Sequence, residues 1–504
     1  MNKRNKIILI SLLSTIFVMV LVIGITKSFM KPIEQGGNIT EVSLNSCAKI
    51  KLTSTSNVNL SSSYPMSRNR GLQTTPYKFT VTSYCDSYVG FNLYIATLST
   101  NTIDAKYVRY VLTETGTKNV IQEGILSSAE SAETDFTDTE KTELNTGIKG
   151  TYNNIYKIYN DKIPLKGSNS YDLYLFLDGD TADNTTMGKT FKAGIAVKSY
   201  DREDDPILLT DYVKSQYTGT QGENGLYYHD SNLSNGAGDN SYRFAGSNPN
   251  NYICFGSEET TCPTENLYRI IGVIDNKIKL ILADGSTTDM MGKDTGFINT
   301  YKGAGFPTEY YKGIYDLYEI NIYKWSSSKT NTWSDSTTNK TNLNKNFLAY
   351  LNTKNEKWET IITNELWYVG GLTSTNGYRL NAKTAYDYEV GENKDASATI
   401  TSKIGLMYVS EYYYGANPEY WTKTGKDDYG KAINDNWMSV GLYEWTISRN
   451  SDVKDYAFYV MYAGYINSYA IKNANVMRPT FFLTSSVQYA SGDGTISNPI
   501  RLKI

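Results

Sequence analysis

The sequence predicts a multidomain chain with an N-terminal transmembrane helix, an all-β sandwich domain and a larger α+β domain. The run from Ile7 to Ile25 carries no charged residue. Residues 38–199 hold segments in which apolar and polar residues alternate, as they do in half-buried strands. From residue 226 onward, hairpin patterns mix with a helical periodicity. At 504 residues, the chain also exceeds what one hydrophobic core usually organises.

The apolar run Ile7–Ile25 predicts a membrane anchor within residues 1–30. As a helix it spans roughly the 30 Å hydrocarbon core of a bilayer, so lipid is its expected partner. Lys3, Arg4 and Lys6 precede it, which favours a cytoplasmic N-terminus and places the bulk of the chain outside. No A-x-A cleavage pattern follows the run. A cleaved signal peptide is the alternative, and it leaves the exported side unchanged.

The composition points to an extracytoplasmic, β-rich protein that does not bind nucleic acid. Lys and Arg number 49 against 52 Asp and Glu, and no basic stripe accompanies this balance. The chain has 44 tyrosines but only 15 phenylalanines. Tyrosine combines a large apolar body with a polar tip, which suits wet sheet surfaces as well as cores.

Four cysteines support export to an oxidising compartment. Their spacing predicts two disulfides, Cys47 with Cys85 and Cys254 with Cys262. Metal binding is the rival interpretation. It is disfavoured because the chain has no C-x-x-C and a single histidine, His229.

The β-sandwich domain is predicted over 38–199 and the α+β domain over 226–504. Short alternating segments such as YKFTVTSYC and YDLYLFLDG, separated by turn residues, predict the sandwich. Residues 200–225 carry an acidic cluster, Pro206 and a Gly-rich run, and are predicted to be a linker.

In the second domain, a hairpin is predicted around Asp275-Asn276, between two apolar strands. The best helical candidate is LNKNFLAYLNTKNEKWETIITNELW. Apolar residues recur in it every three to four positions, at Leu343, Phe347, Leu351, Trp358 and Ile362.

The C-terminal motifs carry a resemblance to a family. Four motifs are similar to uncharacterised domains of Gram-positive bacterial surface proteins: Trp445-x-x-Ser448-Arg449, the tyrosine-, asparagine- and serine-rich hairpin of 457–471, Arg478-Pro479, and a closing Gly492-x-Gly494-Thr495 followed by Asn-Pro. That family resembles the C-type-lectin-like fold, in the branch shared with formylglycine-generating enzymes. The resemblance covers 226–504 and is most specific from Trp437. It implies a C-type-lectin-like domain displayed outside a bacterial cell membrane, anchored by a single pass. One departure is Val476-Met477, where the family has Gly-Val before Arg-Pro, so that the family's glycine is lost.

The first domain loosely resembles β-sandwich modules of Gram-positive surface and matrix-fibre proteins, through TTPYKFTVTSYC and TFKAGIAV. The formylglycine-generating activity does not carry over, because those enzymes use cysteines late in the domain. This chain has none after Cys262.

No catalytic residues are predicted. His229 has no nucleophile motif beside it, and Ser326-x-x-Lys329 lacks the companion elements of penicillin-binding enzymes. Asp387 and Glu389 lie two apart in an apparent polar loop, where both are expected to stay ionised. A glycan-active enzyme is therefore a minor alternative. Calcium stays open, because oxygen ligands abound in Asp230–Asp239, but no specific motif supports it. No other metal or cofactor is expected.

The segment 457–471 predicts a hairpin with Tyr462-Ala463-Gly464 as a three-residue loop and Gly464 in the left-handed conformation. That loop pairs Val460 with Ile466 and puts Phe458 on the same core face.

The other face carries the predicted ligand-binding residues Tyr459, Tyr465, Asn467 and Tyr469, which are expected to be exposed. Tyrosine with asparagine and serine is the composition of antibody loops. The alternative is that these tyrosines only cover a wet sheet surface in a tyrosine-rich protein. The sequence thus predicts an adhesin-like protein that binds an extracellular glycan or protein. A structural subunit of a surface fibre or envelope layer is the alternative. The residues do not name the ligand or the oligomeric state.

Overall fold

The chain folds into two compact units, Met1–Asp205 and Pro206–Ile504. The computed structural model describes residues 48–52, 58–60, 64–85, 87–147, 150–163, 165–186, 188–202, 205–294, 296–374, 380–423 and 430–504. The prediction of a β-rich, multidomain chain is confirmed. The predicted anchor Ile7–Ile25 lies outside the described residues. Among those residues, no helix combines the length and apolar character needed to cross a membrane.

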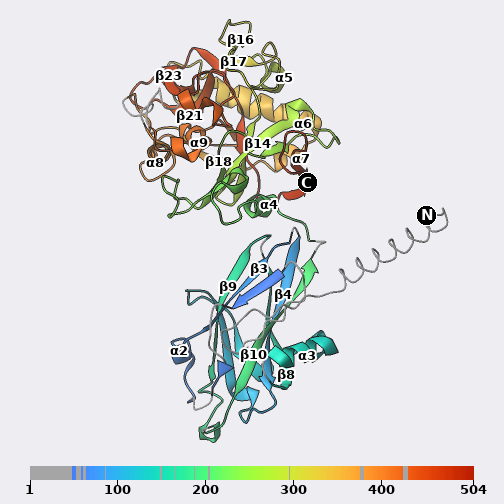
Figure 1. Ribbon diagram of the computed structural model, residues 1–504. Coiled ribbons are helices and arrows are strands. Elements are labelled where there is room, and N and C mark those ends of the chain that lie inside the picture. Colours follow the sequence, from blue (N-terminus) through green and yellow to red (C-terminus); the bar gives the residue numbers. More distant parts are fainter. Residues whose placement is uncertain are drawn as a thin grey trace, which may run out of the picture. The chain divides into compact units, whose positions relative to one another are not determined.

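Unit 1 contains two five-stranded antiparallel sheets (Figure 1). The first sheet has the order β1 (Ala48–Leu52), β3 (Tyr77–Ser83), β9 (Ser168–Leu177), β5 (Val108–Glu114) and β6 (Val120–Ile125). The second has the order β2 (Val58–Asn59), β10 (Lys192–Arg202), β4 (Tyr88–Leu98), β8 (Tyr152–Ile163) and β7 (Glu130–Ser131). Short helices α2 (Arg68–Gly71) and α3 (Asp138–Gly147) complete the unit.

The two sheets share one hydrophobic core because their inward residues alternate along each strand. Phe79 and Val81 of β3 enter this core with Phe91 and Leu93 of β4. The next residue of β4, Tyr94, points the other way, to a second cluster that includes residues from the α3 region. Strand β4 is therefore covered on both faces.

Unit 2 is built on two larger sheets. A seven-stranded sheet contains β11 (Leu226–His229), β12 (Ser241–Phe244), β14 (Leu267–Ile274), β15 (Lys277–Leu282), β25 (Thr480–Phe482) and β20 (Ile404–Gly405), with β13 (Tyr252–Cys254) beside β14. A six-stranded sheet has the order β16 (Phe297–Thr300), β17 (Asn321–Lys324), β24 (Ala474–Val476), β21 (Glu444–Arg449), β22 (Tyr456–Val460) and β23 (Ile466–Ala470). Two-stranded ribbons pair β18 (Glu365–Tyr368) with β19 (Thr399–Ser402) and β26 (Gln488–Ser491) with β27 (Arg501–Lys503).

The helices of unit 2 are short. They are α4 (Leu209–Ser215), α5 (Thr288–Met291), a π-helical segment Thr338–Phe347 that continues as α6 (Leu348–Lys354), α7 (Lys357–Thr360), α8 (Ala382–Glu389) and α9 (Val409–Tyr414). The predicted helix is confirmed up to Lys354, whereas its last residues, 365–367, instead lie in strand β18. All its periodic apolar residues are buried. The predicted hairpin at Asp275-Asn276 is also confirmed, with both residues at positive φ, as a type I′ turn requires.

The predicted linker 200–225 is instead divided between the two units. Tyr200 and the residues after it extend β10 of unit 1. In unit 2, Leu209 and Val213 of α4 are buried in the main core. The Leu209 amide donates to the Val487 carbonyl at 2.8 Å, and the Tyr212 ring stacks on Tyr489 with centroids 3.8 Å apart. The sequence around α4 is polar, and the residues that α4 contacts lie near the C-terminus. These contacts therefore could not be predicted from the local sequence.

We therefore expect Leu209→Ala to lower the free energy of unfolding of unit 2 by about 2–4 kcal/mol through lost burial. Lys214→Ala, on the same helix but half-buried, is the matched control and should change it by less than about 1 kcal/mol. Chemical denaturation of the two variants measures the difference. Equal, small effects would mean that α4 behaves as a linker after all.

Candidate functional site

The hairpin of β22 and β23 has the predicted register. Val460 lies opposite Ile466, and Phe458 lies opposite Ser468. The Met461 amide donates to the Tyr465 carbonyl at 2.8 Å, which closes a three-residue loop. Gly464 occupies that loop at φ +86°, the left-handed conformation expected of it. The loop chemistry therefore sets which side chains share a face.

The inner face of this hairpin belongs to the core. Phe458 is completely buried, and Val460 and Ile466 are each 3% exposed. They join the main hydrophobic cluster of unit 2, as predicted. The hairpin is thus held to the domain by its inner face, and its outer face carries the tyrosines.

On the outer face, the expected exposure is wrong for Tyr459, which is only 6% exposed. Its ring contacts Tyr443, Trp445 and Tyr469, with centroids 5.8–6.0 Å apart. Burial raises the pKa of its hydroxyl well above the ordinary range, so it stays a neutral phenol. Tyr459 is a support beneath the surface rather than a contact residue.

Tyr469, which leans on Tyr459, is 45% exposed, and Tyr465 is half-buried. Asn467 is also half-buried, and its Oδ1 accepts the Ser468 amide at 2.8 Å. This hydrogen bond indicates a structural role for Asn467. The structure therefore separates the predicted binding residues into surface tyrosines and the residues that hold them.

A distant loop, residues 301–320 between β16 and β17, adds to this face. Tyr310 is 42% exposed, and its ring lies 5.6 Å from that of Tyr462 in the hairpin turn. Tyr462 in turn packs edge-on against Tyr443 at 5.1 Å. We call Tyr310, Tyr462, Tyr465 and Tyr469 the tyrosine platform. In Figure 1, strands β16, β17 and β23 are labelled toward the same end of unit 2.

The same loop forms a shallow depression of about 320 Å³, lined by Lys302, Tyr311, Tyr315, Asp316, Leu317 and Tyr318. Buried Asp284 anchors it, since one carboxylate oxygen accepts the Tyr311 hydroxyl and the backbone amides of residues 314 and 315. Tyr318 is 63% exposed at the rim. Sequence reasoning missed this loop, and its only signal was the tyrosine density of TEYYKGIYDLY.

The Arg478-Pro479 motif holds strand β21, which is the neighbour of the hairpin strand β22. Arg478 of the Arg-Pro pair is buried, and its Nε lies 2.7 Å from a carboxylate oxygen of Glu444 in β21. Its Nη2 donates to the Met438 carbonyl at 2.6 Å. Met477, at the departure from the family pattern, is completely buried, and its carbonyl accepts the Ser286 amide. These residues serve folding, because none of them reaches the surface.

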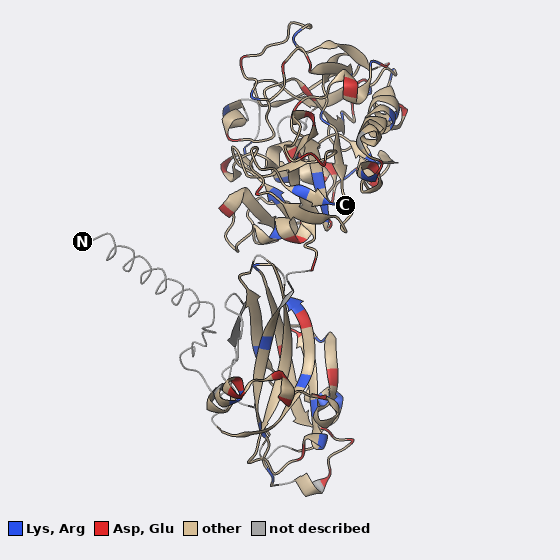
Figure 2. Cartoon of the chain, turned by 90° about the vertical axis from the view of Figure 1, so that its right-hand side faces the viewer, with Lys and Arg blue, Asp and Glu red and all other residues tan. Residues whose placement is uncertain are grey.

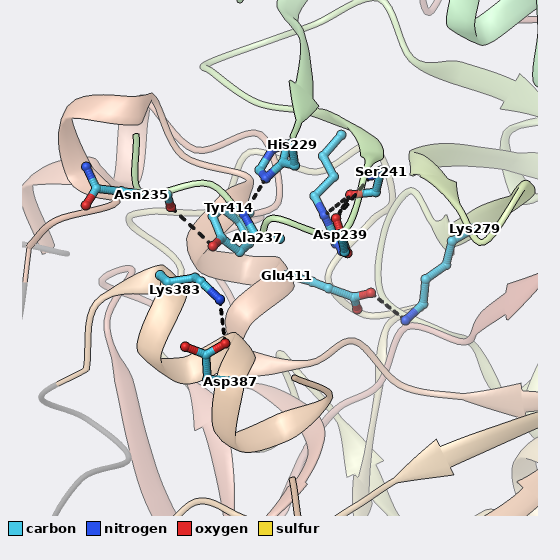
Figure 3. Close-up of polar contacts among 11 residues, drawn as sticks. His229, Asn235, Ala237, Asp239, Ser241, Lys279, Lys383, Asp387, Glu411 and Tyr414 are labelled. Atoms are coloured by element: carbon cyan, nitrogen blue, oxygen red, sulfur yellow. Dashed lines mark hydrogen bonds and ion pairs between the residues drawn. The ribbon is translucent and has the colours of Figure 1, made fainter. Parts of the chain in front are cut away.

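Asp387 and Glu389 are not neighbours in a polar loop; both lie on α8, and they point to different surroundings. Asp387 pairs with Lys383 one turn earlier at 2.5 Å, as Figure 3 shows. Glu389 is completely buried and accepts the backbone amides of Val409 and Ser410 at 2.9 and 2.8 Å, together with the Ser448 hydroxyl. Desolvation raises the pKa of Glu389 to about 6, outweighing these hydrogen bonds. The pair cannot act together on a glycosidic bond.

His229 is completely buried as well (Figure 3). Its Nδ1 accepts the Ala237 amide at 3.0 Å, and the ring lies between Tyr414 and Trp421. Burial, with Arg243 nearby, lowers its pKa to about 3, so the imidazole stays neutral. Nearby, the buried Lys279 ammonium pairs with Glu411 at 2.5 Å. These groups hold α9 and the sheet together and are closed to a substrate.

The remaining candidate motifs have local partners. Ser326 is buried and hydrogen-bonds the Ser328 hydroxyl, whereas Lys329 is exposed, so they do not form a nucleophile pair. Asp239 pairs with Arg243 at 2.7 Å. Within the described ranges, no group of three or more His, Cys, Asp or Glu side chains is placed to hold a metal ion.

The predicted disulfide between Cys254 and Cys262 is confirmed, with Cα atoms 5.8 Å apart. Of the other predicted pair, Cys85 is buried in unit 1, and Cys47 lies outside the described residues.

Comparisons with protein-family models, with curated proteins and with solved structures find no match to this chain.

Truncating buried Tyr459 and truncating exposed Tyr469 should reduce the stability of unit 2 by different amounts. Tyr459→Ala should lower the free energy of unfolding by about 3 kcal/mol or more, because it removes a buried aromatic ring. Tyr469→Ala removes a ring that is nearly half exposed and should cost less than about 1 kcal/mol. Thermal or denaturant unfolding of both variants checks this. A reversed order would mean that the register is shifted.

The buried carboxyl predicts a specific pH dependence. The pKa of Glu389 rises from 4.5 to about 6 on folding, so its protonated form is favoured in the native state. Its contribution is fully present below pH 4.5 and is lost as pH rises through 6, a change of about 2 kcal/mol. Glu389→Gln cannot titrate. The stability of wild type relative to this variant should therefore fall between those pH values, as urea denaturation at several pH values would show. A stability difference between wild type and Glu389→Gln that does not change with pH would contradict the raised pKa of the buried Glu389 carboxyl.

Proposed function

We propose that this protein is a membrane-anchored, surface-exposed recognition protein of a bacterial cell. Its second unit would be a C-type-lectin-like domain that binds an extracellular glycan or protein through the tyrosine platform. The anchor Ile7–Ile25 and the C-terminal motifs are the sequence evidence for this proposal. The confirmed disulfide Cys254–Cys262 is consistent with an exported chain.

The observation that carries the proposal is the layered construction of the platform. Tyr310 and Tyr469 expose nearly half of their side chains. Tyr459 packs against Tyr469, and Tyr462 packs against both Tyr310 and Tyr443. Rings that are already held in place lose little entropy when a ligand arrives, and tyrosine offers a large contact area with a hydroxyl at its tip. An exposed aromatic cluster on a rigid sheet is more typical of a binding surface than of a solvated face.

No comparable support exists for an enzyme. Among the described residues, the carboxylates and the histidine that sequence patterns singled out are buried in structural contacts or paired on the surface. A structural subunit of a fibre or envelope layer is the competing proposal. It draws on the stacked sheets of unit 1, where β6 is an edge strand that pairs only with β5 among the described strands.

Binding to a glycan array and to a panel of extracellular proteins tests the proposal. The double variant Tyr465→Ala/Tyr469→Ala should lose at least about 2 kcal/mol of binding free energy, roughly thirtyfold in affinity, because aromatic anchors dominate such surfaces. Leu366→Ala is the control, since Leu366 is 51% exposed on β18, outside the platform. Thermal unfolding verifies that each variant is folded.

A ligand bound equally well by the double variant would overturn the platform as the binding surface. Sedimentation of the purified protein distinguishes the competing proposal. Polymerisation without any ligand, unaffected by the tyrosine variants, would favour the structural subunit.

A further inference from the structure

The chemistry of the tyrosine platform and of the neighbouring depression narrows the class of ligand, if the platform is a binding surface as proposed above. The platform side chains Tyr310, Tyr462, Tyr465 and Tyr469 end in phenol hydroxyls and include no Asp, Glu, Lys or Arg. Figure 2 shows acidic and basic residues interspersed over the described chain, with most of the ribbon carrying neither. A ligand recognised by its own charge would find little to pair with on the platform.

The edge of the hairpin argues against a peptide that adds as an extra strand. Strand β23 ends the six-stranded sheet, and the hydrogen-bonded pairs at Met461–Tyr465 and Asp455–Ile471 bracket it. Since such pairs alternate, Ser468 and Ala470 direct their backbone groups outward. The Ser468 amide already donates to Asn467 Oδ1, and the Ala470 carbonyl already accepts the Asn473 amide. The edge is therefore partly capped, which favours the exposed ring faces over the strand edge as the contact surface.

One loop contributes to both surfaces. Tyr310 packs against the hairpin, and the next residue, Tyr311, lines the depression. Two subsites that share one loop suit a narrow, chain-like ligand.

The depression adds the polar groups that the platform lacks. Lys302 and Asp316 line it beside Tyr318, and its volume of about 320 Å³ is at the small end of ligand pockets. An ammonium and a carboxylate together can donate to and accept from hydroxyl groups of an uncharged ligand. The negative faces of tyrosine rings attract weakly positive C–H groups. Sugars offer both features, since a pyranose has C–H groups on its ring faces and hydroxyls around its rim.

We propose that the ligand is a neutral oligosaccharide chain, with sugar rings lying on the tyrosine platform and one further sugar held in the depression beside Tyr318. This inference rests on the proposed function and adds the ligand class and a second subsite. It makes Tyr318 a ligand contact, although Tyr318 lies well apart from the hairpin in sequence.

The test measures binding of the purified protein to soluble neutral polysaccharides (an α-glucan, a β-glucan and a mannan) by affinity electrophoresis and calorimetry. Polygalacturonate serves as the charged comparison. At least one neutral polysaccharide should bind. Raising salt from 50 to 500 mM should change that affinity less than about twofold, because no net charge pairs across the contact. Tyr469→Ala and Tyr318→Ala should each weaken it by about tenfold or more, while Leu366→Ala leaves it unchanged.

Every other outcome contradicts a specific part of the proposal. If no neutral polysaccharide binds, but a protein ligand is found that Tyr469→Ala releases, the glycan inference falls and the proposed binding surface stands. Preference for polygalacturonate, abolished by salt, would replace a neutral ligand with a charged one. If Tyr469→Ala weakens glycan binding and Tyr318→Ala, shown to be folded, does not, the depression is not a subsite. If neither class of ligand depends on the platform, the proposed function falls as well.

Discussion

The pairing of Val460 with Ile466 determines what unit 2 presents to its surroundings. Side chains alternate along a strand, so a slip of one residue would turn Phe458 and Val460 outward and bring the tyrosines into the core. The three-residue loop ending at Gly464 prevents that slip. A Cβ added to Gly464 would lie 2.9 Å from the Ile433 side chain, in a conformation that other residues rarely adopt. The exposed chemistry of the domain thus depends on one short turn.

Beneath the hairpin, buried polar pairs fix the position of the neighbouring strand β21. Glu444 at its start meets Arg478, and Ser448 near its end meets Glu389 of α8. Removing one partner of such a pair would leave a buried polar group without a hydrogen bond. That is far more destabilising than the loss of a surface contact. Within the motifs that carry the resemblance, the Trp-x-x-Ser-Arg and Arg-Pro residues are therefore explained by folding. The hairpin motif of 457–471 instead supplies Tyr462, Tyr465 and Tyr469 of the platform, whereas Tyr310 and Tyr318 lie outside the motifs.

Features that neighbouring residues decide could be predicted from the sequence, whereas features that depend on contacts between distant segments could not. The hairpin register and the left-handed Gly464 were predictable, because a few consecutive residues decide both. The burial of Tyr459 was not, because it depends on Tyr443 and Trp445 covering a face that alternation alone labels as outer. Likewise, TAYDYEVGEN looked like a polar loop, yet Glu389 is buried at the end of a helix by contacts with residues 409, 410 and 448. Tyr310 could not be predicted as part of the platform, because it lies on a loop far from the hairpin in sequence and meets it only through tertiary packing.

The central claim is that Tyr310 and Tyr469 form an accessible surface supported by an inaccessible Tyr459, and that this surface meets the ligand. Nitration of tyrosines, followed by mass spectrometry of the peptides, measures this directly, because the reagent modifies exposed rings first. In the free protein, Tyr310 and Tyr469 should react quickly and Tyr459 hardly at all. With a saturating ligand, the two exposed rings should become protected while Tyr64 of unit 1, which is 68% exposed, stays reactive. Rapid nitration of Tyr459, or protection that leaves Tyr310 and Tyr469 untouched, would contradict the account.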